Sequence, residues 1–369
     1  MEYLSNEAVY DLLINLTRDE TLNFRTITEQ TLEDFSAGGE RAYQPPPSAG
    51  TRPNGQRTLI RPFTSDSAVG AKLIVSPAPT PDSKSYPLHG LIILLDALGH
   101  PTGLMAAEEV TGYRTSMNAI VPFCWRKNVE NVVIFGGGVQ ALWHTRLVLA
   151  LRGDQLKRIT FVNRSKDRID SLINTVLREN GARWKSECSF HFIGTTESDF
   201  QQQIQACLAE ADCIFCTTPS QTPLFPATYL TERRTTGRRP FISAVGSWQP
   251  DMIELDPTLL HHVAEADDGY NPATGEGRGV VLVDDKEYAL EHAGEMIQSR
   301  IMAEDMVEIG HIIALRSGKL AAPSGDHAEA TNRFISEGFV VYKSIGVSLT
   351  DLTISNAILE LKKGKAGSL

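Results

Sequence analysis

The sequence predicts an α/β protein with two domains, and three observations support this. The chain has 369 residues, about twice the length of a typical domain. Hydrophobic residues make up 41% and charged residues 22%, as in ordinary globular proteins. Short strand-like runs separated by Pro and Gly turns fill the first part, whereas strand and helix signals alternate from Glu130 onward. We therefore expect a doubly wound parallel sheet and a second, smaller α+β domain.

The charge balance limits the possible partners. The formal net charge is −10, and no long Lys/Arg run is present, which argues against nucleic-acid or anionic-membrane binding. A local basic pocket for a small anion is still allowed. No apolar run approaches the roughly 20 residues that span a bilayer, and the N-terminus does not resemble a secretory signal. We expect small-molecule partners and a cytoplasmic location.

The five cysteines are too few and too scattered for a disulfide framework. Cys213 and Cys216 form a C-x-x-C within an apolar run that is typical of a buried strand. Residues three apart on a strand point to opposite faces, so core packing is expected rather than redox or metal chemistry.

The spacing of apolar residues predicts two helices near the N-terminus. Ser5 or Asn6 can cap a first helix, whose apolar residues recur at helical spacing through Leu16. A second helix is expected over about 22–35. Residues 36–56, including the proline-rich loop 44–57, are expected to form a long polar loop.

Three strand-like runs follow that loop, at 58–60, 71–75 and 91–95. Residues 96–101 make a turn, 102–106 can pair back, and a helix near 108–125 can link two domains. Turn signals between short strands favour an antiparallel or mixed sheet.

The second part of the chain has the α/β pattern. Its expected parallel strands are 131–135, 159–162, 189–193, 213–217 and 241–245. Residues 320–333 are expected to be loop-like. A last strand at 338–342 then leads into a C-terminal helix.

A glycine-rich loop follows the first of these strands. Gly136-Gly137-Gly138-Val139-Gln140-Ala141 has the spacing G-x-G-x-x-A, and a helical stretch runs on through Leu151. Glycines allow a tight turn close to a pyrophosphate, and the helix N-terminus supplies free N–H groups. Because strand, loop and helix occur in the required order, we expect a Rossmann-type dinucleotide site; the alternative is a tight turn without a ligand.

The residues after the second strand indicate which dinucleotide binds. An NAD site places Asp or Glu there, whereas this chain has Asn163-Arg164-Ser165, with Arg168 one turn later. Asn163 would not repel a 2′-phosphate, and Arg164 could donate two N–H groups to it. NADP(H) is therefore predicted over NAD(H), although both arginines could simply be solvated surface charges. Asp154 precedes the strand and is wrongly placed for the ribose.

Two basic residues in the first part are candidates for the chemistry. Lys72 stands within the apolar run Ala71-Lys-Leu-Ile-Val75, and Arg114 lies on or near a helix. The plain alternative for each is a solvent-facing charge.

The chain resembles the ornithine cyclodeaminase/mu-crystallin family. The resemblance rests on motifs that occur in order from Lys72 to the C-terminus: Thr111-x-x-Arg114-Thr115, Gly136 to Ala141 with His144, Ala244-Val245-Gly246 to Glu254-Leu255, Val283-Asp284-Asp285, Gly294-Glu295, and Tyr342-Lys343-Ser344-Ile345-Gly346 with Asp351.

The resemblance implies a substrate-binding and dimerisation domain at 1–125 and 326–369, a Rossmann domain at 126–325, and a homodimer. It implies that Arg114 holds a substrate carboxylate and that Lys72 lies beside the reacting carbon. A second arginine would help; we favour Arg61 over Arg52 and Arg57. The expected cofactor contacts are Gly136, Gly138, Val139, Gln140, Asn163, Arg164, Ser165, Arg168, Thr217, Thr218, Val245, Gly246, Ser344 and Gly346.

One departure from the family pattern separates two activities. Relatives that deaminate ornithine carry an acid two positions after the glycine that matches Gly246, and this chain has Trp248 there. Releasing ammonia needs proton shuttling, which Trp cannot supply; Asp251 is three residues away. The pattern resembles the ketimine-reductase side of the family, and Trp248 could shape a substrate pocket.

Several other polar residues are candidates for minor roles. His89 is a candidate substrate contact, and Glu108 and Glu109 could orient Arg114. His144 is expected to pack rather than catalyse, and the pair His261-His262 lacks an evident third metal ligand.

The resulting hypothesis is an NAD(P)H-dependent oxidoreductase acting on CH–NH bonds. It would reduce an imine that bears a carboxylate, and we expect a cyclic ketimine that becomes a cyclic amino acid. Two alternatives stay open: an amino-acid cyclodeaminase or dehydrogenase with bound nicotinamide, and a non-catalytic NADPH-binding protein.

Overall fold

The computed structural model describes residues 2–78, 88–232, 239–247, 249–266, 269–323 and 326–366. The chain divides into two compact units. Unit 1 combines Met1–Arg114 with Val347–Leu369, and unit 2 is Thr115–Gly346. Helix α3 (Ala107–Phe123) begins in unit 1 and ends in unit 2. Among the described residues, no helix has both the length and the apolar character needed to cross a bilayer.

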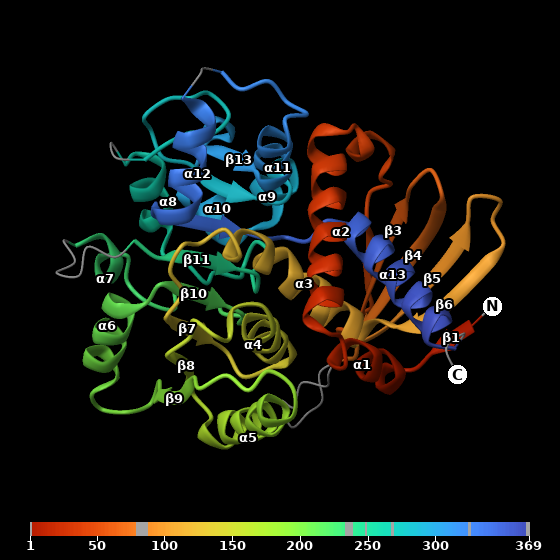
Figure 1. Ribbon diagram of the computed structural model, residues 1–369, viewed down its shortest axis with the longest axis horizontal. Coiled ribbons are helices and arrows are strands. Elements are labelled where there is room, and N and C mark those ends of the chain that lie inside the picture. Colours follow the sequence, from red (N-terminus) through yellow and green to blue (C-terminus); the bar gives the residue numbers. More distant parts are fainter. Residues whose placement is uncertain are drawn as a thin grey trace. The chain divides into compact units, whose positions relative to one another are not determined.

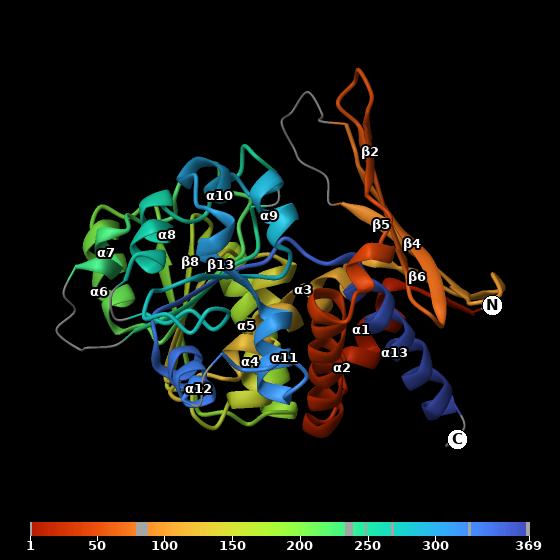
Figure 2. The same ribbon diagram turned by 90° about the horizontal axis from the view of Figure 1, so that it is seen from above.

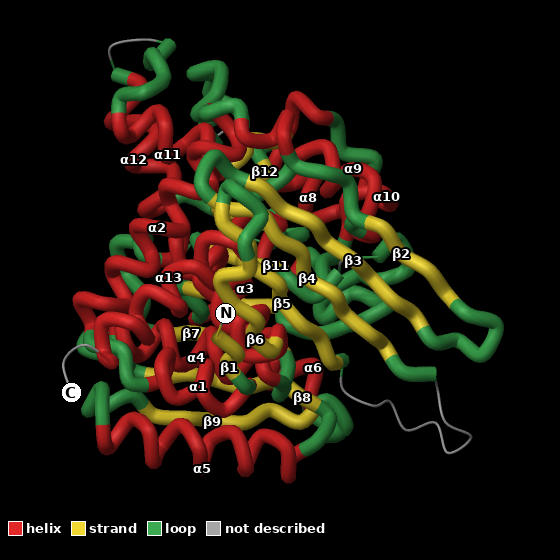
Figure 3. The backbone as a smooth tube through the Cα atoms, turned by 90° about the vertical axis from the view of Figure 1, so that its right-hand side faces the viewer, coloured by secondary structure: helices red, strands yellow, loops and turns green. Residues whose placement is uncertain are grey.

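Unit 1 contains a six-stranded sheet with helices on one face. Its strand order is β1-β6-β5-β4-β3-β2; β1 pairs in parallel with β6 and the other pairs are antiparallel. Figure 1 and Figure 2 show α1, α2 and α13 on the same side of these strands, and Figure 3 shows β2 to β5 side by side. The bounds are β1 Glu2–Leu4, β2 Ser48–Thr51, β3 Arg57–Thr64, β4 Ala68–Ser76, β5 His89–Asp96, β6 Pro101–Ala106, α1 Asn6–Ile14, α2 Arg18–Ala37 and α13 Ser348–Ala366.

The two faces of this sheet differ because strand side chains alternate. Ile92 and Leu94 of β5 are fully buried on the helix-covered face, while Ile93 between them is 38% exposed. The register places Arg61, Lys72 and Ile92 directly opposite one another on β3, β4 and β5. Lys72 and Arg61 therefore share the covered face.

The N-terminal helices begin at side-chain caps. Ser5 Oγ accepts the N–H of Ala8 at 3.2 Å, as the sequence predicted for α1. Helix α2 begins earlier than predicted because Thr17 and Glu20 form a capping box, with the Thr17 N–H donating to Glu20 Oε2 at 2.7 Å.

The prediction of an unbroken loop over 36–56 is wrong. A 3-10 helix covers Glu40–Tyr43, and Ser48–Thr51 forms the edge strand β2 against Arg57–Ile60. The residues of β2 are small and exposed, so they carry no hydrophobic alternation, and backbone pairing alone defines the strand.

Unit 2 contains an eight-stranded sheet in which every pairing is parallel. The order is β13-β12-β14-β11-β10-β7-β8-β9. The strands are β7 Asn131–Phe135, β8 Arg158–Asn163, β9 Ser189–Gly194, β10 Cys213–Cys216, β11 Phe241–Ala244, β12 Val281–Val283, β13 Met306–Glu308 and β14 Val340–Lys343.

Helices cover both faces of this sheet (Figure 1), which confirms the predicted doubly wound α/β fold. One face packs on a core that includes Ile204, Leu208, Leu259 and Met296. On the other face Phe215 of β10 lies against Phe123 and His144. The helices are α4 Val139–Arg152, α5 Lys166–Ala182, α6 Phe200–Glu210, α7 Thr228–Thr231, α8 Pro257–Ala264, α9 Lys286–His292, α10 Gly294–Ser299, α11 Ile309–Ser317 and α12 His327–Glu337.

Several elements of unit 2 differ from the sequence prediction. Residues 320–333 were expected to be a loop, but α12 begins at His327 and buries Thr331, Phe334 and Ile335. The sequence pattern also missed β12 and β13, which are three residues long each and too short to show a period.

The unit boundaries differ from the predicted 1–125, 126–325 and 326–369. The breaks lie at Arg114/Thr115 and at Gly346/Val347. Strand β14 belongs to unit 2 because it pairs with β11 and β12 inside the parallel sheet. Only the residues from Val347 onward join the N-terminal portion.

Candidate active site

The glycine loop lies at the point where the strand order reverses. Strands β8 and β10 flank β7 on opposite sides, and the loop leaves the carboxyl end of β7, where ligands bind in such sheets. Gly136 has φ +120°, and a Cβ there would lie 2.6 Å from Thr217 Oγ1. The positive φ and the close approach of Thr217 both require glycine at this position.

The start of α4 is open to a ligand. Gly138 is its N-cap and provides no side-chain cap, and Val139 is 50% exposed. The first-turn N–H groups of this 14-residue helix therefore have the geometry for an anion. Gln140 accepts the Ser116 hydroxyl at 3.3 Å.

The loops after β10 and β11 are joined by one buried carboxylate. Glu254 Oε1 accepts the Thr218 N–H at 2.5 Å and its hydroxyl at 3.0 Å, and Oε2 accepts the Gly246 N–H at 2.6 Å. A Cβ on Gly246 would collide with the Thr218 carbonyl oxygen. These predicted cofactor contacts, with Val245 and Thr217, are therefore held at adjoining strand ends.

A buried charge cluster lies next to these loops. Lys343 Nζ is 2.8 Å from Ser247 Oγ and 3.3 Å from Glu295 Oε1, and Ser247 also donates to Glu295. Lys343, Glu254 and Glu295 are all fully buried. Burial raises the pKa of Glu254 to about 7, against the lowering effects of Lys343 and two backbone N–H groups. One ammonium facing two carboxylates favours a proton on Glu254.

Replacing Glu254 with Gln is expected to flatten the pH dependence of stability. The folded pKa of about 7 exceeds the ordinary 4.5, so the stability that Glu254 contributes is full below pH 4.5 and is lost as pH rises to about 7. We expect the wild-type free energy of unfolding to fall by up to about 3 kcal/mol across this window from this group. Denaturant unfolding at several pH values measures the slope. The exposed Glu329→Gln is the control, and an unchanged slope in E254Q would exclude the account.

A second buried carboxylate holds the turn after β14. Asp284 accepts the hydroxyl of Ser344 at 2.7 Å and the N–H groups of Ile345 and Gly346 at 2.9 and 2.7 Å. Gly346 has φ +94°. Ser344 and Gly346 thus lie in a rigid turn at the carboxyl edge of the sheet.

The residues that would choose between NAD and NADP lie at the end of β8. The Asn163 amide donates to Ser165 O at 3.2 Å, and Ser165 caps α5. A Cβ on Gly137 would lie 3.3 Å from Asn163 Nδ2 and 3.5 Å from Arg168 Cδ. Arg164 and Arg168 are exposed, and the Arg168 side chain lies beside the glycine loop.

His144 and the paired cysteines are packing residues, as predicted. His144 Nδ1 lies 2.9 Å from Ser116 Oγ and 2.8 Å from Gln140 O, and burial lowers its pKa to about 4. Cys216 joins the core on one sheet face while Cys213 points to the other, and burial raises the pKa of both thiols.

Unit 1 brings the two predicted catalytic residues onto one carboxylate. Lys72 Nζ lies 2.8 Å from both oxygens of Asp351, in the first turn of α13, and 3.5 Å from Thr111 Oγ1. Arg114 Nε donates to Asp351 Oδ1 at 2.9 Å. Lys72 and Asp351 are fully buried, and Arg114 is 4% exposed.

The charges of this cluster are not balanced. Burial lowers the pKa of Lys72 to about 7, with Arg114 and Arg61 adding repulsion and Asp351 opposing it. Burial favours a neutral Asp351, but the surrounding cations outweigh it and lower the pKa of that carboxyl. Arg114 Nη1 is buried and has no hydrogen-bond partner among the described residues. A buried guanidinium with an open donor suits an incoming carboxylate.

The other predicted substrate contacts fall in different places. Arg61 faces Lys72 across the β3–β4 pair. His89 pairs with Val75, which is three residues after Lys72 on the same strand, so His89 lies on the opposite face of the sheet from Lys72. The His89 side chain is 69% exposed, and its Nδ1 lies 2.8 Å from Glu108 Oε1. Glu108, which was expected to orient Arg114, instead contacts His89 and accepts the Gly90 N–H. The carboxylate that pairs with Arg114 is that of Asp351. Trp248 lies outside the described residues.

The other polar candidates, Asp251 and His261, lie outside these clusters. Asp251 is in an exposed turn and accepts the Gln221 amide at 3.1 Å. His261 Nε2 lies 2.5 Å from the Ser299 carbonyl oxygen. Within the described ranges, no three His, Cys, Asp or Glu side chains gather as metal ligands.

The fold and the two clusters define a class of protein, namely a two-unit α/β protein with a dinucleotide-type glycine loop and a buried Lys–Asp–Arg cluster. The family model of the ornithine cyclodeaminase/mu-crystallin family matches residues 17–366, so the chain belongs to that family.

Two curated relatives illustrate its range. An uncharacterized cyclodeaminase of Dictyostelium discoideum is 28% identical over 301 residues, covering 79% of this chain and 75% of the relative. A Δ1-pyrroline-2-carboxylate reductase of Bacillus cereus (strain ZK / E33L) is 26% identical over 343 residues, covering 89% and 88%.

Solved structures share the fold over nearly the whole chain. The Thermococcus litoralis Δ1-pyrroline-2-carboxylate reductase, solved with NADH and L-proline, has a TM-score of 0.71 at 16% identity and covers 99% of this chain and 98% of its own. An archaeal alanine dehydrogenase dimer with bound NAD also has a TM-score of 0.71, at 20% identity, with 99% and 96% covered.

Proposed function

We propose that this protein is an NADPH-dependent reductase of a cyclic imine that bears a carboxylate, and that it produces a cyclic amino acid. The observation that carries the proposal is the cluster in which the buried side chains of Lys72 and Arg114 both contact the carboxylate of Asp351, with the half-buried Arg61 opposite Lys72. The excess positive charge suits an anionic substrate. The pyrroline-2-carboxylate reductases among the relatives support Δ1-pyrroline-2-carboxylate as the first substrate to test.

The residues at the carboxyl edge of unit 2 fit a dinucleotide. The left-handed Gly136 and the uncapped start of α4 would take the pyrophosphate, and Thr218, Gly246 and Gly346 lie in turns fixed by Glu254 and Asp284. The bound dinucleotide supplies the hydride for the imine carbon.

The residues of unit 1 hold the substrate and supply the proton. Arg114 binds the carboxylate, with its open Nη1 as one donor. Lys72, whose pKa is about 7, is poised to give a proton to the imine nitrogen as that nitrogen becomes an amine. Asp351 positions both cations, because Oδ1 accepts hydrogen bonds from Lys72 Nζ and from Arg114 Nε.

Replacing Arg164 with Gln is expected to weaken NADPH binding by about tenfold or more while leaving NADH binding within about twofold. A charge-assisted contact to the 2′-phosphate is lost, and NADH has no such group. Fluorescence titration of both cofactors measures the two affinities. The exposed Arg178 on α5 provides the matched control, R178Q. Equal losses for NADPH and NADH in R164Q would refute the proposed role.

A homodimer forms part of the proposal, and the face of the unit 1 sheet opposite its helices supports it. Ile60, Val69 and Ile93 are 43%, 40% and 38% exposed on neighbouring strands of that face. Such an apolar patch is costly in water. Light scattering should give twice the chain mass of 40.5 kDa. Ile93→Glu should give one chain mass with its circular dichroism retained, and a monomeric wild type would contradict the proposal.

Two other activities remain as rival outcomes. The Dictyostelium relative is named a cyclodeaminase, and ammonia release from ornithine without net cofactor change would identify that reaction. Tight NADPH binding without turnover would indicate a binding protein. A cytoplasmic location is also proposed; none of the five cysteines, all within the described residues, forms a disulfide, in keeping with a reducing compartment.

A further inference from the structure

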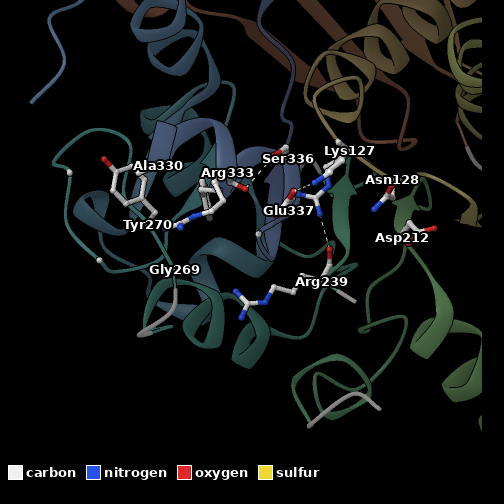
Figure 4. A pocket seen from close by; sticks show the side chains of 15 residues that line it. Lys127, Asn128, Asp212, Arg239, Gly269, Tyr270, Ala330, Arg333, Ser336 and Glu337 are labelled. Carbon is white, nitrogen blue, oxygen red and sulfur yellow. Dashed lines mark hydrogen bonds and ion pairs between the residues drawn. The ribbon is translucent and has the colours of Figure 1, made fainter. Parts of the chain in front are cut away.

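A second site candidate lies in unit 2 at the amino edge of the parallel sheet. A cavity of about 780 Å³ opens there. Asn128, Asp212 and Arg239 line it, and they precede β7, β10 and β11, as Gly338 precedes β14. The glycine loop follows β7 and so lies at the other edge of the sheet. The cavity, whose lining side chains Figure 4 shows, is therefore separate from the proposed dinucleotide site.

The cavity lining carries more positive than negative charge, although the whole chain carries −10. Its cations are Arg126, Lys127, Arg239 and Arg333, and its acids are Asp212 and Glu337. Both acids are already engaged. Asp212 Oδ2 accepts the N–H groups of Glu130 and Asn131 at 2.8 and 2.9 Å, and Glu337 Oε1 pairs with Lys127 Nζ at 2.6 Å.

Arg126 is the buried cation of this lining. It is 5% exposed, and its Nη1 and Nη2 donate to the carbonyl oxygens of Ile335 and Arg239 at 2.9 and 2.7 Å. Both acceptors are uncharged. Its Nε is buried and has no hydrogen-bond partner within the described part of the chain. Burial lowers the pKa of Arg126, and Asp212 and Glu337 nearby oppose that shift without reversing it. A further anion beside this buried guanidinium would therefore stabilise its charge.

We propose that this cavity binds a small organic anion with two or more phosphate or carboxylate groups. Arg126 supplies the buried charge, and Arg239 and Arg333 line the cavity with two further guanidinium groups. Tyr270 and Phe334 add apolar wall, so the ligand carries a carbon skeleton as well as its anionic groups. A volume of about 780 Å³ is in the range of small-molecule sites.

Calorimetric titration with inorganic pyrophosphate, and separately with citrate, tests this site and distinguishes phosphate from carboxylate ligands. The titrations use the full chain at constant ionic strength with saturating NADPH, which occupies the glycine loop. We expect saturable binding of at least one probe. The double variant R239Q/R333Q should weaken it by about tenfold or more, whereas the exposed-surface control R178Q should not.

A second variant, Glu337→Gln, tests the anion site independently if the double variant folds poorly. Glu337→Gln removes the acid paired with Lys127, so the probe should bind several times more tightly. Loss of probe binding in R164Q would place the probe in the glycine loop and overturn the proposal. Absence of saturable binding for both probes, or equal affinities in wild type, R239Q/R333Q and E337Q, would overturn it as well. None of these outcomes depends on imine reduction.

Discussion

Replacing Lys72 with methionine is expected to lower kcat for imine reduction by about a thousandfold while leaving NADPH affinity unchanged. Lys72 is the ionisable donor of the cluster, and a positioned general acid contributes about 10²–10⁴ in rate. Methionine fills nearly the same buried volume without a proton to give. Asp351 keeps its bond from Arg114 in this variant, so no buried carboxylate is stranded.

The pH profile should agree with this role. With the pKa of Lys72 at about 7, the protonated donor is depleted above neutrality, and kcat/KM should fall as pH rises through about 7. Lys157→Met, at an exposed lysine paired with Glu130, is the matched control and should behave as wild type. Wild-type turnover in a folded K72M protein would remove Lys72 from the mechanism, and NADPH titration with thermal unfolding reports on its integrity.

Replacing Arg114 with methionine is expected to raise KM for a carboxylated imine by about a hundredfold or more. Truncating one member of a buried, hydrogen-bonded charge pair costs about 2–5 kcal/mol in binding. The matched comparison is 1-pyrroline, which has the same ring without the carboxylate. Wild type should strongly prefer Δ1-pyrroline-2-carboxylate, and R114M should lose most of that preference because the contact responsible is gone.

Arg114→Lys separates charge from geometry. Lysine keeps the positive charge but cannot donate a planar pair of N–H groups, so R114K should lie between wild type and R114M. The ratio of kcat/KM for the two imines is the measurement, since general damage lowers both values together. A ratio that stays at the wild-type value in R114M would show that another residue binds the carboxylate.

The sequence predicted the parts of the fold whose signals are local. The strand, glycine loop and helix from Asn131 to Arg152 are contiguous, and each piece has its own pattern. The C-x-x-C strand was also predicted correctly, because period-2 alternation alone decides its faces. In contrast, β12 and β13 are too short for a pattern, and the small residues of β2 have none.

The supporting carboxylates could not be assigned from the sequence. Asp351 is 279 residues from Lys72 and 237 from Arg114, and only the fold brings these groups together. The same holds for Glu254, which is 36 residues from Thr218. The available signals were the family motif that includes Asp351 and the position of this acid close to the apolar residues Val347, Leu349 and Leu352. A charged residue among buried neighbours indicates a partner but does not identify it.

The measurement that tests the central claim most directly is the loss of NADPH absorbance with a panel of cyclic imine carboxylates, with NADH run in parallel. The account predicts turnover of at least one five- or six-membered ketimine carboxylate, faster with NADPH than with NADH, and formation of the corresponding cyclic amino acid. If NADPH binds but no imine in the panel is reduced, and ornithine releases ammonia instead, the reductase assignment is contradicted.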